Sequence, residues 1–421
     1  MGCYFMDSTN SQEELSVSTE GTVGPFKNVL SAGFRPFFLL AGAYAVLAMA
    51  AWLFWLALHA NNGVVPSPTF SVAPHLWHGH EMLFGFAGAV ITGFLLTAVP
   101  NWTGTPAMSG TPLILLMGTW LLGRFVMWFS TYLPPLLVAF VDVGHFALLA
   151  GFIGYALSFK PAARNLVFIA ILFLLIVANA TVHAEWIGWS EGTASWGLTL
   201  AIYLLSTMIV IIGGRVVPAF TRNAMKSSER KGQLPQSYAV LDAAAILSAV
   251  SLPLSHLLGV SAPVFAMLAT VAAVINAVRL ILWRGWRMLD QPIVWSLHLG
   301  YLFVVLGFGS VGLGETGLIG STAAVHVLAA GAVGCMTLAI MTRASLGHTG
   351  RPLRVSKATA ASYLLIATSG LVRAFLPSAS DVSYFTVMYL AGACWIAGFG
   401  LFCISYAPIL VGPRRLPQGE E

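Results

Sequence analysis

The chain has 421 residues, of which 58% are hydrophobic and only 8% are charged, and its formal net charge is +5. A soluble domain carries roughly 25% charged residues, so this composition excludes a soluble protein and predicts one that is solvated by lipid. The basic residues lie between apolar runs, where they orient helices in a membrane, so the positive charge does not indicate a nucleic-acid partner.

Apolar runs long enough to cross a bilayer follow one another along almost the whole sequence. Residues 1–30 come first and lack the features of a signal peptide, so we expect a disordered cytoplasmic tail there. About twelve transmembrane helices are then predicted, near 36–59, 78–99, 113–131, 135–158, 165–188, 196–218, 237–258, 262–282, 292–312, 321–344, 358–376 and 385–408. The prediction is an all-α polytopic membrane protein, with one 12-helix domain over residues 31–412 and a second cytoplasmic tail over 413–421.

Lys and Arg gather in alternate loops of this arrangement, and the remaining loops carry acidic residues instead. The basic residues concerned are Lys27, Arg35, Lys160, Arg164, Arg222, Lys226, Arg230, Lys231, Arg284, Arg287, Arg343, Arg351, Arg354, Lys357, Arg414 and Arg415, and the acids are Glu191, Glu315 and Asp381. Because positively charged loops stay in the cytoplasm, both termini are predicted to lie inside, in the inner membrane of a bacterium. One miscounted helix would destroy this alternation.

Most of the histidines fall near the outer ends of the predicted helices. With the helix directions fixed, one layer on the periplasmic side contains His59, His75, His78, His80, His183, His256 and His326, together with Glu81 and Glu185. Ionisable groups at membrane depth are costly and usually functional, and histidine is the commonest metal ligand. We therefore expect a metal site here, with His75, His78, His80, His183 and His326 as its candidate ligands.

Helix geometry divides these candidates. Residues two positions apart on a helix point about 200° from each other. We therefore expect His78 and His80 to bind two different metal centres, or one of them to orient a ligand of the metal that the other binds. Asn179 shares a helix face with His183 and is a candidate ligand or supporting residue. An isolated histidine at a helix end, such as His256, is more typical of an interfacial residue with a satisfied hydrogen bond. The deeper residues Asp142, His145 and His298 are more typical of packed polar groups than of a transport path.

Two of the predicted helices share the pattern H-x-x-x-x-G-x-x-G, beginning at His80 and at His326. Glycines on one face usually allow close helix packing, but the same smooth surface would admit a flat macrocycle. The pattern therefore suggests a haem b between His80 and His326, with His78 as a further ligand candidate. Arg124 and Arg373 are the basic residues of the outer half, and they would pair with haem propionates or extend to lipid headgroups.

A weaker repeat links three regions of the chain. The motif V-P-N-W-T at Val99–Thr103 ends the second predicted helix, and V-P-A-F-T at Val217–Thr221 ends the sixth, four helices later in the chain. The two histidine–glycine helices are the second and the tenth, eight helices apart. This spacing suggests a pseudo-threefold arrangement of four-helix units. Such an arrangement resembles the architecture of the haem-copper oxidases, although the adjacent histidine pair expected for their copper is absent.

Several long segments are specifically similar to the NnrS family. They are G-F-R-P-F-F at Gly33–Phe38, W-H-G-H-E-M-L-F-G-F at Trp77–Phe86, G-F-L-L-T-A-V-P-N-W-T-G at Gly93–Gly104, G-G-R-V-V-P-A-F-T-R-N at Gly213–Asn223 and M-T-R-A-S-L-G-H-T-G-R at Met341–Arg351. The resemblance covers about residues 30–415. It implies a bacterial membrane protein that contains haem and copper and handles nitric oxide, in denitrification or nitrosative stress.

The resemblance and the histidine layer together favour an oxidoreductase similar to nitric oxide reductase. The sequence has no c-type haem motif, so electrons would come from membrane quinol or a partner protein. Glu81 and Glu185 are the candidate proton carriers, unless they only anchor neighbouring His or Arg residues. The alternatives are a metal or small-molecule transporter that uses the same histidines, and a sensor that binds nitric oxide without turnover.

Overall fold

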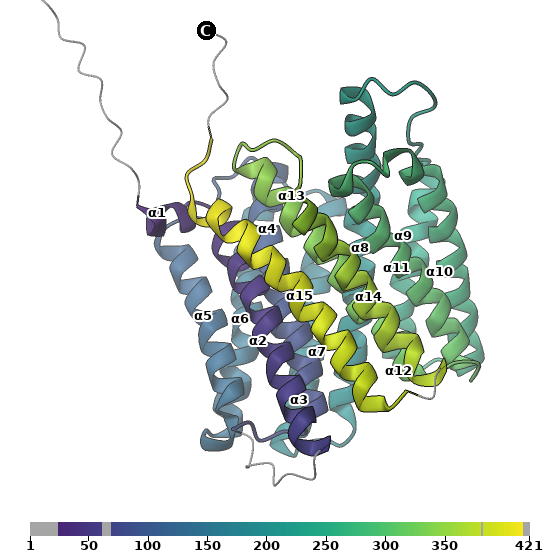
Figure 1. Ribbon diagram of the computed structural model, residues 1–421. Helices are drawn as coiled ribbons and strands as arrows, with labels where there is room; N and C mark the ends of the chain where they lie inside the picture. Colours follow the sequence, from purple (N-terminus) through teal and green to yellow (C-terminus); the bar gives the residue numbers. More distant parts are fainter. Residues whose placement is uncertain (1–23, 61–68, 380–381, 416–421) are drawn as a thin grey trace, which may run out of the picture.

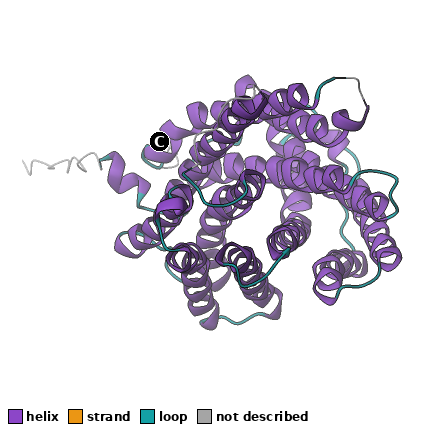
Figure 2. Cartoon of the chain, turned by 90° about the horizontal axis from the view of Figure 1, so that it is seen from below, coloured by secondary structure: helices purple, strands orange, loops and turns teal. Residues whose placement is uncertain are grey.

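The computed structural model describes residues 24–60, 69–379 and 382–415. Residues 1–23 of the predicted tail 1–30, residues 416–421 of the predicted tail 413–421, and the acidic residue Asp381 lie outside these ranges. Every regular element of the described chain is a helix, as Figure 2 shows in a view along the bundle. The predicted all-α class is confirmed.

Twelve helices in the described part of the chain are long and apolar enough to cross a membrane, which confirms a multi-pass membrane protein with the predicted number of spans. In chain order they are α2 (Phe34–Ala60), one continuous span of α3 (Pro74–His80), η1 (Glu81–Ala87) and α4 (Gly88–Thr103), α5 (Thr111–Trp128), α6 (Pro135–Ser158), α7 (Ala163–Ile187), α8 (Thr193–Ser227), α9 (Ala239–Leu258), α10 (Ala262–Leu282), α11 (Pro292–Glu315), one continuous span of α12 (Ser321–His326), η4 (Val327–Val333) and α13 (Gly334–His348), α14 (Lys357–Ala379) and α15 (Tyr384–Val411). Three short helices complete the fold: α1 (Pro25–Val29), η2 (Ser130–Tyr132) and η3 (Gly285–Met288).

Two elements differ most from the sequence predictions. Helix α8 continues past residue 218, where the predicted span ends, as far as Ser227, with Pro218 inside it. A proline is tolerated within a membrane helix because neighbouring groups satisfy the carbonyl that it leaves free. Helix α1 occupies part of the segment 1–30 that was predicted to be disordered.

The two histidine–glycine spans share an irregularity that the sequence did not reveal. Each changes from α-helix to π-helix directly after its histidine, at η1 after His80 and at η4 after His326. Each returns to α-helix at the second glycine of the pattern, Gly88 or Gly334. Short π-helical segments are rare and occur frequently at functional sites.

Three spans form the centre of the bundle. The spans that begin at Pro74, Thr193 and Ser321 are the three most buried, with 78%, 72% and 67% of their apolar stretches inside the protein. Around them, the last span of each group of four packs against the first span of the next: α6 on α7, α10 on α11, and α15 back on α2. This cyclic packing agrees with the predicted pseudo-threefold arrangement of four-helix units.

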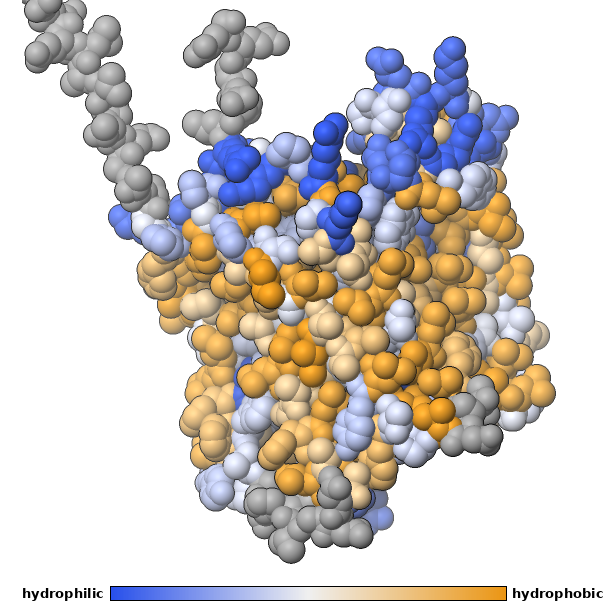
Figure 3. Space-filling view, in the orientation of Figure 1, coloured by the Kyte–Doolittle hydropathy of each residue, from blue (hydrophilic) through white to orange (hydrophobic). Residues whose placement is uncertain are grey.

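The two ends of the bundle have different surfaces. Figure 1 shows α1 and the C-terminal end of α15 at one end, and α3 and α12 at the other. Figure 3 shows hydrophilic residues gathered at the first end above an apolar belt. We call the first end the basic face and the second the distal face. Both ends of the described chain therefore lie on one side, as the charge alternation predicted.

Candidate functional site

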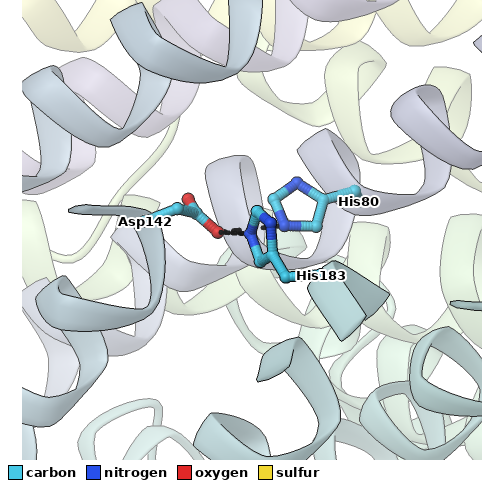
Figure 4. A group of neighbouring side chains, drawn as sticks. All are labelled: His80, Asp142 and His183. Atoms are coloured by element: carbon cyan, nitrogen blue, oxygen red, sulfur yellow. Dashed lines mark hydrogen bonds and ion pairs between the residues drawn. The ribbon is translucent and has the colours of Figure 1, made fainter. Parts of the chain in front are cut away.

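Three ligand-type side chains from different helices meet in the interior near the distal face. His80 of α3, Asp142 of α6 and His183 of α7 form the His–Asp–His group (Figure 4). The Nε2 atoms of His80 and His183 lie 3.1 Å and 3.0 Å from the same oxygen, Oδ2 of Asp142. All three residues are buried, and their ligand atoms lie within 4.8 Å of one another. Two imidazoles and a carboxylate so arranged can hold a transition-metal ion.

Neighbouring polar groups fix the orientation of these ligands. Glu81 Oε1 lies 2.9 Å from Nδ1 of His80, and the amide oxygen of Asn179 lies 2.9 Å from Nε2 of the same ring. Asn179 also donates its amide hydrogen to Asp142 Oδ2 at 2.8 Å, and the hydroxyl of Tyr44 donates to Glu81. A carboxylate bonded to the far nitrogen of a ligating histidine is the usual support for a metal site.

A buried arginine balances the charge of this group. Arg124 donates from NH1 to Glu81 Oε1 at 2.7 Å and from NH2 to Asp142 Oδ1. Burying two carboxylates would be costly without such a partner. The guanidinium of Arg124 is thus shared between two carboxylates inside the protein, so the structure gives no support to its predicted pairing with haem propionates.

A separate cavity of about 540 Å³ lies at the distal face, between the central spans and helices α2, α14 and α15. We call it the histidine cavity, because His75, His78 and His326 line it together with Arg373 and Glu315. Its other walls are mainly apolar and aromatic. A mainly apolar cavity with a few convergent polar groups is the usual form of a cofactor or ligand site.

Two of the cavity histidines have a ring nitrogen without a hydrogen-bond partner among the described residues. His78 stacks on Trp52, with ring centroids 4.8 Å apart, and its buried Nδ1 has no hydrogen-bond partner. His326 Nδ1 lies 2.7 Å from the carbonyl oxygen of Thr322 and donates to it. In the neutral imidazole that bond leaves Nε2 of His326 unprotonated, as a metal ligand must be.

The structure does not bring His80 and His326 together, so it gives no support to the predicted haem between them. His326 lines the histidine cavity. His80 is not among the lining residues, and its ring contacts Glu81 and Asn179 instead. Helix geometry is the reason, because residues two apart face opposite ways. His78, not His80, shares the cavity with His326.

The glycines of the repeated pattern serve helix packing. A Cβ added at Gly85 would overlap Tyr44, and one at Gly88 would overlap Phe146. In the second copy, Gly331 faces Phe303. These glycines admit neighbouring side chains and not a macrocycle, so the packing alternative is the one the structure supports.

The other candidates have structural partners. Glu185, predicted to carry protons, accepts a hydrogen bond from the backbone nitrogen of Ala194 in the first turn of α8, at 2.7 Å. It belongs to neither site, so that role is not retained. His145 lies between two threonine hydroxyls, and His256 lies 3.1 Å from the carbonyl oxygen of Trp196. His298 lies 2.8 Å from the hydroxyl of Thr221.

Asp142 and Tyr44 are the members of the site that sequence reasoning missed. Asp142 is an acidic residue in an apolar span, which is itself a signal of a functional site. Its depth along the helix, however, suggested only a packed polar residue. Asp142 enters the site because α6 packs against both α5 and α7, which carry Arg124 and His183.

Fold and site together define a twelve-span α-helical membrane protein, with a buried His–Asp–His group and a histidine-lined cavity side by side in its distal half. The family model described as NnrS protein matches residues 28–414, nearly the whole chain. The chain belongs to the NnrS family, which relates it to nitric oxide and to haem and metal binding, as the sequence motifs implied. No curated protein sequence matches it.

Proposed function

We propose that this protein binds nitric oxide and reduces or otherwise detoxifies it at the histidine cavity. The observation that supports the proposal is the pair His78 and His326, which line one cavity from different spans, each with a ring nitrogen for which the described residues provide no hydrogen-bond partner. Family membership points to nitric oxide as the molecule handled.

The residues of the cavity fit a haem b. Its volume of about 540 Å³ lies within the range of cofactor pockets, and imidazole is a common axial ligand of haem iron. His78 and His326 would hold the iron, and Arg373 would pair with a haem carboxylate through its planar fork of donors. Bound there, the haem would supply an iron centre for nitric oxide and for electron transfer.

The His–Asp–His group fits a copper ion. Its donor atoms are two imidazole nitrogens and one carboxylate oxygen, a set that suits copper among other transition metals. His80, Asp142 and His183 would be the ligands. Glu81 and Asn179 would fix the ring of His80 through the contacts that they already make.

The chain's own residues would also move protons and admit electrons. Reduction of two nitric oxide molecules to nitrous oxide and water consumes two electrons and two protons. Glu81 is the candidate proton carrier, because its carboxylate contacts the hydroxyl of Tyr44 and the ring of His80. Electrons would come from membrane quinol or a partner protein. We further propose that the basic face is the cytoplasmic side of a bacterial inner membrane, with the cavity toward the periplasm.

Purification in detergent, followed by metal analysis and optical spectra before and after nitric oxide, tests this function. We expect a haem b spectrum that shifts on nitric oxide binding, copper in the same preparation, and consumption of nitric oxide when a quinol is supplied. A transporter of metal would lack the haem spectrum, and a sensor would bind nitric oxide without consuming it. Either result would replace the proposal.

A further inference from the structure

A second, smaller cavity lies among the three central spans. It has a volume of about 70 Å³, and its walls come from η1 and α4, from α8, and from η4 and α13. We call it the apolar pocket. It lies among the central spans of the pseudo-threefold arrangement, between the histidine cavity and the basic face.

The walls of the apolar pocket offer almost nothing to a water molecule. Thr337 is the one lining residue with a hydroxyl or amide side chain, and its hydroxyl donates to the carbonyl oxygen of Gly334 at 3.0 Å. A buried water needs two to four polar partners, and cavities lined by apolar side chains stay dry and bind apolar molecules or xenon. These walls therefore favour an apolar guest over a bound water molecule.

The apolar pocket adjoins the histidine cavity. Val333 lines both of them. On the first central span, Phe86 lines the cavity and the next residue, Ala87, lines the pocket. Both π-helical segments end at this junction, at Ala87 and Val333. The histidine cavity and the apolar pocket thus follow one another from the distal face to the middle of the bundle.

From this geometry we infer that the apolar pocket is a binding site for a small, uncharged diatomic gas, which for this protein is nitric oxide. The inference rests on the proposed function. Nitric oxide is small and apolar enough for a dry pocket of this size. A second molecule held beside the cavity would be useful, because nitrous oxide formation joins two molecules of nitric oxide at one place. A lipid acyl chain is the competing occupant.

Xenon tests the pocket without depending on haem, copper or turnover. Crystals of the complete protein are pressurised with xenon, and its position is found from anomalous scattering. We expect a xenon atom between α4, α8 and α13. Absence of xenon from the pocket, or acyl-chain density in its place, would overturn the inference.

A matched pair of variants extends the test. Val90 lines only the apolar pocket, whereas Val274 is 58% exposed on the lipid-facing side of α10. Val90→Phe should abolish xenon binding and raise the nitric oxide concentration needed for half-maximal consumption several-fold, with an unchanged haem spectrum. Val274→Phe should change neither. If Val90→Phe does not fold, Thr337→Leu fills the pocket from α13.

The two proposals fail in distinguishable ways. Xenon in the pocket of a protein that neither binds haem nor consumes nitric oxide would leave the pocket as a gas site and remove the proposed function. Consumption of nitric oxide by a protein whose pocket takes no xenon would retain the function and remove the gas site.

Discussion

His78 and His80 stand two residues apart on α3 and belong to different sites. His78 stacks on Trp52 and lines the histidine cavity, whereas His80 belongs to the His–Asp–His group, where Asn179 and Glu81 contact its ring. One turn of one helix therefore forms part of both proposed cofactor sites. A change at either histidine should affect its own site first, and this makes the two sites separable by mutation.

Separate substitutions of His78, His80 and His326 should show which of the two cofactors each histidine binds. His78→Ala and His326→Ala should each reduce haem content, because each removes a nitrogen from the histidine cavity. His80→Ala should retain haem and lose copper. Optical spectra and metal analysis of the purified variants measure both quantities. His256→Ala is the control, since His256 lies outside both sites and contacts only the carbonyl oxygen of Trp196 by hydrogen bond. Loss of haem in His80→Ala alone would reverse the assignment.

Asp142→Asn should destabilise the protein as well as remove the second metal. The substitution keeps the shape of the side chain but removes a buried negative charge opposite Arg124. Breaking a buried ion pair typically costs about 3–5 kcal/mol. Glu81 would still contact Arg124, so we expect the lower part of this range. Thermal unfolding of the detergent-solubilised protein, together with metal analysis, measures the two effects.

Asp290→Asn provides the matched control for that substitution. Asp290 pairs with Arg230, but its side chain is 56% exposed. Exposed pairs contribute only about 0–1 kcal/mol, so this variant should unfold near the wild-type temperature. Equal losses of stability in the two variants would mean that the Asp142 pair is not buried as the structure has it.

Spans and their directions were predictable from the sequence because lipid imposes a simple rule on composition. Each span must be apolar for about 20 residues, and Arg and Lys must lie on one side, as at Arg230 and Arg351. These constraints act along the chain and need no knowledge of which helices touch. The number of spans and the common side of the termini followed from them.

Side-chain partnerships could not be predicted in the same way, because they depend on helix rotation and packing. Depth alone placed His80 and His326 in one layer, yet they face different neighbours. Depth also placed Arg124 in the histidine half of the bundle, but its partners come from η1 and α6, whose contacts with α5 are not visible in the sequence. The change to π-helix after His80 and His326 also left no sequence signal beyond the repeated glycines.

Arg373 should support haem retention through its charge. Arg373→Gln should lower the haem content of the purified protein, since it removes the cation that lines the cavity beside His326. Arg373→Lys should restore part of it, because a lysine keeps the charge without the planar fork of donors. Haem-to-protein ratios measured by absorbance provide the comparison. Arg354→Gln, on an exposed residue of the α13–α14 connection, is the control. A haem content that is the same in all four proteins would exclude this role.

Gly331→Ala should destabilise the bundle, because a Cβ at this position would overlap the ring of Phe303. The backbone of Gly331 also lies directly against Gly370 of α14, so the helix has little room to move away. Overpacking of this kind costs about 1–3 kcal/mol. Thermal unfolding in detergent measures the loss.

Gly118→Ala is the comparison that makes the Gly331 result interpretable. Gly118 is also within a helix, but nothing lies within 4 Å of an added Cβ there. Replacing a helical glycine by alanine where space is free should stabilise the helix by roughly 0.5–1 kcal/mol. The two variants should therefore shift the unfolding temperature in opposite directions. A gain in stability for Gly331→Ala would mean that η4 and α11 are not packed as closely as the structure places them, and the glycine pattern would again be free to border a cofactor.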